Sequence, residues 1–155
     1  MTCRVIDGGP ALAQPRVEAG ATPAPAPVAR RTHVPEDTAT QVQRYIAAWN
    51  ETEPQARSRA VAALFTEDAR YVDPLVDVRG HDGIDAAIAA VHQQFPGWAF
   101  RLAGPVDAHH DQVRFTWGLG PEGDEPPVVG SDVAVTDGDG RFARVSGFLD
   151  RVPQQ

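Results

Sequence analysis

Apolar residues recur at helical spacing in three segments of the first two thirds of the chain. In the first segment, about 36–50, they fall at i, i+3, i+4 and i+7, which places them on one face of a helix. The second segment has its apolar stripe over 60–65 and the third over 84–95, with Asp82 as a candidate N-cap of the third. The spacing predicts three helices, the second packed on the first.

Beyond residue 98 the apolar period changes to two, which is typical of strands. Turn residues rich in glycine, proline and aspartate separate five predicted strands, at 98–102, 106–109, 112–119, 128–136 and 142–149. Two shorter strands, at 69–73 and 75–78, precede the third helix and suggest an irregular hairpin. Helices followed by an antiparallel sheet predict an α+β fold.

The first 35 residues differ from the rest of the chain. Prolines alternate with alanines there, and no helical or strand period is sustained. Such a segment buries too little apolar area to offset its ordering entropy, so we expect residues 1–35 to be a disordered tail. The remaining residues, 36–155, are long enough for one globular domain.

Composition excludes several classes of function. The net charge of -7 is unsuited to a phosphate-binding surface, so nucleic acid is not an expected partner. A single cysteine, Cys3, cannot build a disulfide framework or a cysteine zinc site, and no run of about 18 apolar residues predicts a membrane span. We expect a cytoplasmic protein that does not bind membranes. No glycine-rich nucleotide loop or metal motif is present, so no cofactor is expected, and residues 137–140 predict a hairpin turn rather than a calcium loop.

Three side chains carry the candidate chemistry. Tyr45 lies on the first helix, Asp73 ends a predicted strand before Pro74, and Asp132 lies within an apolar strand. One phenol and two carboxylates on different elements could supply a base and two hydrogen-bond donors for enolate chemistry. Each also has an ordinary interpretation: Tyr45 as a core aromatic, Asp73 as a turn residue, and Asp132 as an edge residue that faces water. Burial would be costly for an ionised Asp132, which favours a pocket role.

Aromatic and histidine side chains suggest further candidates. Trp49, Phe115 and Trp117 could form a core or the wall of a pocket for a small apolar ring-containing ligand. Phe115 and Trp117 share one strand face. His109 and His110 could supply an acid or base, but adjacent strand residues face opposite sides and a turn follows, which favours exposure to solvent.

Several local strings together resemble the nuclear transport factor 2-like superfamily, especially its SnoaL-like and ketosteroid isomerase-like branches. They lie at 43–50, 63–69, 72–74 and 79–84, and the last hairpin is also similar, so the resemblance covers about residues 37–152. It implies a cone, in which a strongly curved antiparallel sheet wraps around a long helix and encloses an apolar pocket. It also implies a homodimer formed through the sheet.

The same resemblance implies roles for the three candidates. Asp73 would move a proton, while Tyr45 and a protonated Asp132 would donate hydrogen bonds to the enolate oxygen. The aspartic acid of this family is itself a known example of a carboxylic acid that an apolar site keeps neutral. Ile88 stands where isomerases carry a supporting tyrosine, which argues against steroid isomerisation itself. Two functions remain open: a cofactor-free isomerase or polyketide cyclase-like enzyme, and a noncatalytic module of the same fold that binds a small molecule or dimerises.

Overall fold

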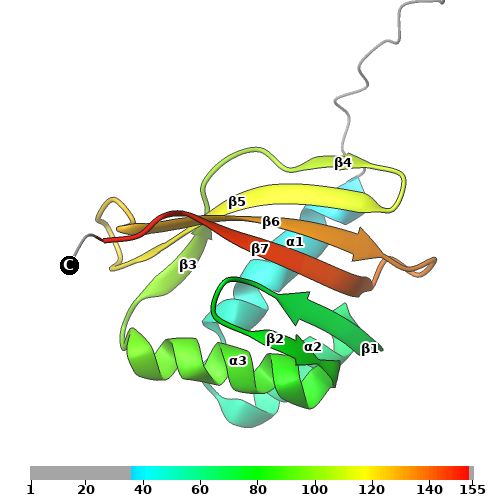
Figure 1. Ribbon diagram of the computed structural model, residues 1–155, viewed down its shortest axis with the longest axis horizontal. Helices are drawn as coiled ribbons and strands as arrows, with labels where there is room; N and C mark the ends of the chain where they lie inside the picture. Colours follow the sequence, from blue (N-terminus) through cyan, green and yellow to red (C-terminus); the bar gives the residue numbers. More distant parts are fainter. Residues whose placement is uncertain (1–35, 154–155) are drawn as a thin grey trace, which may run out of the picture. The chain divides into compact units, whose positions relative to one another are not determined.

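The computed structural model describes residues 36–153, so the predicted tail at residues 1–35 lies outside the described residues. Three helices and seven strands follow one another along the chain (Figure 1), in the order α1 (Glu36–Asn50), α2 (Pro54–Leu64), β1 (Phe65–Val72), β2 (Asp77–Arg79), α3 (Gly80–Gln94), β3 (Ala99–Leu102), β4 (Asp107–His109), β5 (Gln112–Gly120), β6 (Val128–Thr136) and β7 (Phe142–Arg151). The α+β class is therefore confirmed.

The helix ends differ from the prediction at two places. β1 begins at Phe65, directly after α2, so the last residue of the predicted helical stripe at 60–65 lies in a strand. Thr66 and Ala69 are buried in that strand, and this pattern continues the core into the sheet. The N-cap of α3 is Arg79, without a side-chain capping bond, and Asp82 lies in the first turn instead. An acidic residue there still favours the helix through its dipole.

The sheet has the strand order β2-β1-β7-β6-β5-β3, and β4 pairs with the other end of β5. Every pair is antiparallel except β1 and β7, which run parallel from Phe65 beside Phe142 to Val72 beside Ser146. The predicted all-antiparallel sheet is thus wrong in one pair, and the sheet is mixed and unclosed. β1 enters beside the last strand of the chain, a long-range pairing that no local turn signal specifies.

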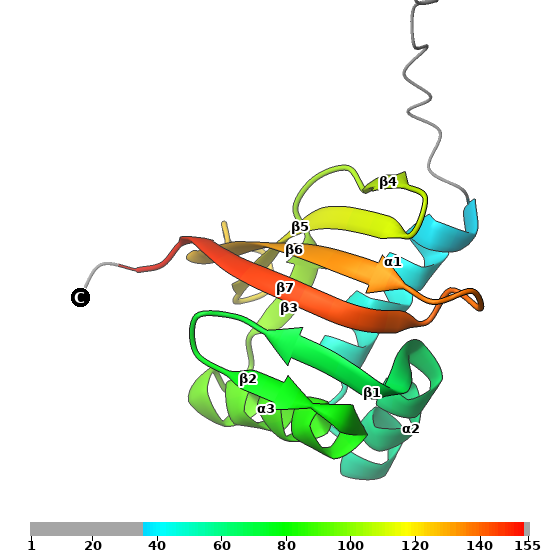
Figure 2. The ribbon, with the colours of Figure 1, turned by 45° about the vertical axis from the view of Figure 1, so that its right-hand side comes forward.

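The long helix α1 packs against the concave face of the sheet. Figures 1 and 2 show α1 crossing behind β5, β6 and β7, while α2 and α3 lie below, next to β1 and β2. Tyr45 of α1 meets Phe115 of β5 and Phe142 of β7 with ring centroids 5.1 and 5.5 Å apart. All three rings are at most 2 % exposed, so aromatic packing fixes the crossing of the helix over the sheet.

Polar contacts cap α2 and join it to α3. Glu53 caps α2 by accepting hydrogen bonds from the backbone N–H groups of Gln55 and Ala56, at 3.0 and 2.6 Å, ahead of Pro54 in the first turn. Arg57 of α2 pairs with Asp85 of α3 at 2.9 Å, and the Arg57 side chain is only 8 % exposed. This largely buried pair holds α2 against α3.

Sheet curvature depends on a close approach at Gly130 of β6. A Cβ there would lie 2.3 Å from the Trp117 ring and 2.6 Å from the Phe148 carbonyl oxygen, so only glycine fits. The register of β6 against β7 also shifts between Val129 and Gly130. Such an irregularity favours a bend in the sheet, and the missing side chain at Gly130 leaves room for the indole of Trp117.

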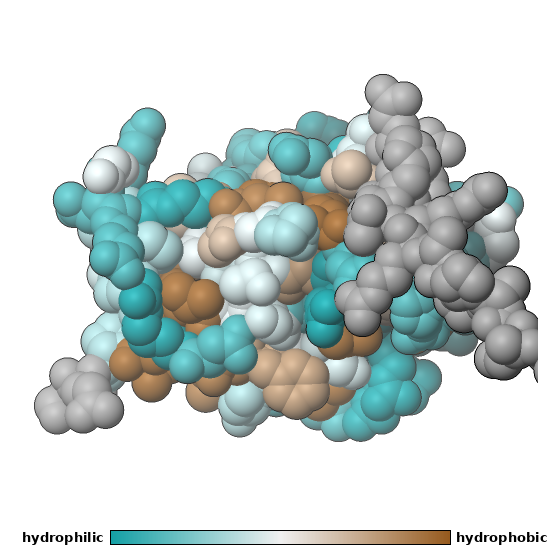
Figure 3. All heavy atoms as spheres, turned by 90° about the horizontal axis from the view of Figure 1, so that it is seen from above, coloured by the Kyte–Doolittle hydropathy of each residue, from teal (hydrophilic) through white to brown (hydrophobic). Residues whose placement is uncertain are grey.

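Exposed apolar side chains are few among the described residues. The large ones are Leu75, Phe148 and Val152 at 72, 57 and 52 % exposure. Seen from above, apolar residues form separate patches among hydrophilic ones (Figure 3). These patches do not identify a dimer interface, so the homodimer stays a prediction.

Candidate active site

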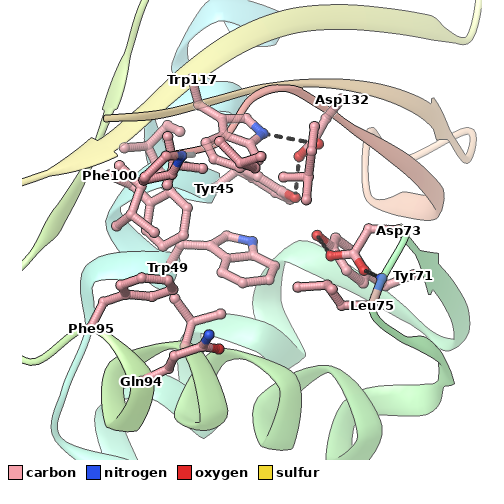
Figure 4. Close-up of a pocket in the computed structure, with 17 residues that line it drawn as sticks. Tyr45, Trp49, Tyr71, Asp73, Leu75, Gln94, Phe95, Phe100, Trp117 and Asp132 are labelled. Carbon is pink, nitrogen blue, oxygen red and sulfur yellow. Dashed lines mark hydrogen bonds between the residues drawn. The ribbon is translucent and has the colours of Figure 1, made fainter. Parts of the chain in front are cut away.

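A cavity of about 460 Å³ lies between the concave face of the sheet, α1 and the C-terminal half of α3 (Figure 4). Its lining is mostly apolar and aromatic, which suits a small ring-containing molecule. The lining residues are Tyr45, Ile46, Trp49, Tyr71, Asp73, Leu75, Val91, Gln94, Phe95, Phe100, Trp117, Leu119, Val128, Asp132, Leu149, Val152 and Pro153. All three candidates for chemistry are among them.

Asp132 is buried at the inner end of this cavity, 1 % exposed, and so does not face bulk water. The strand period places Gly130, Asp132 and Ala134 on the inner face of β6. The carboxylate accepts hydrogen bonds from the Tyr45 hydroxyl at 2.6 Å and from Trp117 Nε1 at 3.0 Å. Burial raises the pKa of Asp132 to about 6, although both donors favour the ionised form and so work against this rise.

Tyr45 reaches Asp132 from the apolar face of α1. Its ring is 2 % exposed, as expected for a core aromatic, and its hydroxyl is nevertheless at the cavity. Burial and the neighbouring charge of Asp132 raise the pKa of Tyr45 well above its usual value, so the phenol keeps its proton. Tyr45 is both a core residue and a hydrogen-bond donor in the candidate site.

Asp73 closes the turn after β1 and lines the same cavity. Its Oδ1 accepts from the backbone N–H groups of Leu75 and Val76 at 2.7 and 2.9 Å, so it organises the turn. Its Oδ2 accepts from the Tyr71 hydroxyl at 3.0 Å. Three donors therefore fix the orientation of this carboxylate at the cavity wall.

Asp73 and Asp132 both border Gly147 of β7. A Cβ on Gly147 would lie 3.0 Å from Asp132 Oδ1 and 3.2 Å from Asp73 Cβ. The absence of a side chain at this position lets both acids approach the same point of the sheet. The charge of Asp73 adds to the rise in the pKa of Asp132.

Two of the three aromatic residues proposed for a pocket wall lie at the cavity. Trp49 and Trp117 line the cavity, and Phe100 packs between them with ring centroids 5.3 and 5.2 Å away. Phe115 does not line it, because its ring packs beneath Tyr45 in the core at 1 % exposure. The Nε1 atom of Trp49 is buried without a hydrogen-bond partner among the described residues.

Tyr71 also lines the cavity, although the sequence pattern did not predict it as a site residue. It is 3 % exposed, it contacts Trp49 with ring centroids 5.2 Å apart, and its hydroxyl holds Asp73. Burial and nearby carboxylates raise the pKa of its phenol, so it remains a donor. A tyrosine two residues before Asp73 on one strand face was the available signal.

None of the histidines that the structure describes lines the cavity. His109 and His110 are exposed at the turn between β4 and β5, and His81 contacts the Phe65 carbonyl oxygen at 3.0 Å. In residues 36–153 no group of three or more metal-binding side chains comes together. The same part of the chain contains no helix with the length and apolar character needed to span a membrane.

Comparisons with known proteins point to one family. Residues 42–145 match the sequence profile described as the SnoaL-like domain. A solved structure of a proposed isomerase of the SnoaL-like family from Agrobacterium tumefaciens is 42% identical, with a TM-score of 0.69 over 73% of this chain and 97% of that one. No curated protein matches the sequence closely.

More distant solved structures share the fold. A proposed ketosteroid isomerase from Kribbella flavida is 21% identical, with a TM-score of 0.57 over 77% of this chain and 82% of that one. A proposed polyketide cyclase from Sinorhizobium meliloti is 18% identical, with a TM-score of 0.56 over 70% and 93%. At these identities the likeness concerns the fold alone.

Proposed function

Because this chain belongs to the SnoaL-like domain family, we propose that it is a cofactor-free isomerase or polyketide cyclase-like enzyme that acts through an enolate. The observation that carries the proposal is the buried hydrogen bond from Tyr45 to Asp132 in an apolar cavity that Asp73 also lines. This arrangement separates a carboxylate base from a pair of acidic groups that could bind a developing oxyanion.

In the proposed reaction the Asp73 carboxylate removes a proton from the carbon next to a carbonyl group. The electron pair of that C–H bond moves into the carbonyl, and the negative charge develops on its oxygen. Tyr45 and protonated Asp132 donate hydrogen bonds to that oxygen. A raised Asp132 pKa makes the neutral acid accessible, and neutral Asp132 no longer needs the proton of Tyr45.

The enolate can react in two ways. In an isomerisation, Asp73 returns the same proton to a different carbon, and the double bond moves. In a cyclisation, the enolate carbon attacks a second carbonyl carbon, a carbon–carbon bond forms, and the new alkoxide takes up the proton that Asp73 had removed, which restores the Asp73 carboxylate. The names of the neighbouring structures support both reaction types equally, so we propose the shared enolate step.

The test is Asp73→Asn, assayed by deuterium exchange from solvent into the carbon next to a ketone. The Asn oxygen can still accept from the Leu75 and Val76 N–H groups, so we expect the fold to survive. We expect exchange to fall by about 10²- to 10⁴-fold, the usual contribution of a general base. Asp77→Asn, on the exposed strand β2, is the matched control. Undiminished exchange in Asp73→Asn would reject Asp73 as the base.

A noncatalytic module of the same fold is the second candidate. The observation in its favour is that every carboxylate oxygen of Asp73 and Asp132 already accepts a hydrogen bond from the protein. In that case these groups would be structural, and the cavity would bind a small molecule without changing it. Ligand binding without deuterium exchange, together with stability loss in Tyr45→Phe, would favour this function.

A further inference from the structure

Three arginines lie directly side by side on the outer face of the sheet. Arg79 of β2 is paired with Arg70 of β1, and Arg70 is paired with Arg144 of β7. Strand alternation turns Arg70 away from the cavity, which its neighbour Tyr71 lines, and paired residues of adjacent strands share a face. Figure 2 shows β7 and β1 side by side, and no described helix crosses in front of them. Adjacent strands are about 4.8 Å apart, so the row of arginines spans about 10 Å of solvent-facing sheet.

One carboxylate pairs with this row. The two oxygens of Asp77 accept hydrogen bonds from Nε and Nη2 of Arg70, at 2.8 and 2.6 Å. Hydrogen bonds from Arg70 and the charges of all three arginines lower the pKa of Asp77, so this carboxylate is ionised at neutral pH. Within residues 36–153, Arg79 and Arg144 form no salt bridge. Three positive charges and one negative charge therefore leave two positive charges in excess.

The needs of the sheet do not account for this row. Like charges directly opposite each other on neighbouring strands destabilise a sheet. A charged side chain can protect the edge of a sheet from pairing with another chain, and this accounts for Arg79 on the edge strand β2. Arg70 and Arg144 lie on the inner strands β1 and β7, where no edge needs protection. An anion bound between the guanidinium groups would relieve the repulsion.

We propose that Arg79, Arg70 and Arg144 bind a small dianionic phosphate group, free or as the ester of a small molecule. Such a group carries close to two negative charges at neutral pH, which matches the local excess, and guanidinium groups bind phosphate oxygens in pairs. The net charge of the chain, -7, opposes a large polyanion, so the row suits one small anion. The site is on the opposite face of the sheet from the cavity and does not depend on the proposed enolate chemistry.

Calorimetric titration of the full chain with inorganic phosphate and with phenyl phosphate, at neutral pH and constant ionic strength, tests the site. We expect a Kd of about 1 mM or lower. Equal affinities would show that the site binds the phosphate group alone, and tighter binding of phenyl phosphate would show that it favours an ester. Arg144→Gln should weaken both by at least about tenfold, because charge-assisted hydrogen bonds are lost. Arg59→Gln is the matched control, since Arg59 is exposed on α2 and lies outside the sheet, and it should leave both affinities unchanged.

Arg79→Lys separates paired recognition from simple charge attraction. Lysine keeps the charge but lacks the planar fork, so phosphate should bind at least about threefold more weakly than to the unchanged chain. Thermal unfolding gives a second readout: without phosphate, Arg144→Gln should melt no lower than the unchanged chain, and phosphate should raise its Tm less. Absence of phosphate binding up to about 20 mM, or equal binding in Arg144→Gln, would overturn the proposal. Self-association that Arg144→Gln weakens, without phosphate binding, would assign the row to a second copy of the chain and overturn it too.

Discussion

The Tyr45 hydroxyl and the Asp132 carboxylate lie 2.6 Å apart although 87 positions separate them in the chain. The contact joins the central helix α1 to the inner face of β6, so it is both a tertiary link and the inner end of the cavity. Because the bond is buried, its strength and the protonation of Asp132 are tied to each other. Substitutions at this contact and around it can separate its structural role from its chemical role.

Tyr45→Phe removes the hydroxyl and keeps the ring. We expect deuterium exchange to fall by about 10²- to 10³-fold, as for loss of an oxyanion donor, and the free energy of unfolding to fall by about 1–2 kcal/mol. Chemical denaturation measures the second quantity. Phe115→Leu is the comparison, because it alters the core beneath Tyr45 outside the cavity and should reduce stability with little effect on exchange by the folded protein. A similar loss of exchange in both variants would contradict a chemical role for Tyr45.

Asp132 makes stability depend on pH in a definite direction. Its folded-state pKa of about 6 lies above the usual value of about 3.9, so the folded protein binds this proton more tightly than the unfolded chain does. The stabilisation of the folded protein by this proton is therefore fully present below about pH 4 and is lost as pH rises through about 6. Relative to Asp132→Asn, the free energy of unfolding should fall by about 2–3 kcal/mol between pH 4 and pH 7. Urea denaturation of both proteins measures this change. A difference in unfolding free energy that stays constant between pH 4 and pH 7 would show that folding does not shift the pKa of Asp132.

Trp117→Phe removes a donor that stabilises the ionised form of Asp132. We expect the Asp132 pKa to rise further, by about one pH unit, a shift worth the free energy of one hydrogen bond. Carboxyl ¹³C resonances report this titration without any substrate. If protonated Asp132 is the oxyanion donor, exchange declines as pH rises above about 6, and the decline moves to higher pH in the variant. Trp98→Phe, which alters a ring stacked on Phe95, is the control. Exchange that instead rises through pH 6 would assign Asp132 as the base.

Much of the fold follows from sequence periodicity, since the helical segments and the strands after residue 98 are close to their predicted ranges. The parallel pairing of β1 with β7 was not predictable, because it joins strands about 75 positions apart and depends on the packing of the whole sheet. Asp132 is buried as predicted, but its neighbours Val133 and Val135 lie on the other face of β6. Its inward neighbours are small, which leaves room for the indole of Trp117.

The site could be predicted only in part for a similar reason. Local strings identified Tyr45, Asp73 and Asp132, yet which aromatic residues reach the cavity depends on where α1 crosses the sheet. That crossing covers Phe115 with Tyr45, whereas Trp117, two residues further along β5, lies beyond it and contacts the cavity. Tyr71 was missed because its role arises from a hydrogen bond to Asp73. Strand periodicity does not predict such a bond.

Gly147→Ala tests whether the spacing of the two acids matters. The new methyl group would lie 3.0 Å from Asp132 Oδ1, 3.2 Å from Asp73 Cβ and 3.5 Å from the Tyr71 hydroxyl, so side chains must move by a few tenths of an ångström. Side-chain rotation can supply that movement, and alanine suits a strand better than glycine, so the free energy of unfolding should change by less than about 2 kcal/mol. Displacement of the acids should reduce deuterium exchange roughly 10- to 100-fold. Gly138→Ala, where a Cβ meets nothing within 4 Å, is the control for both measurements. Full exchange activity in Gly147→Ala would mean that the placement of Asp73 and Asp132 around Gly147 has no part in the reaction.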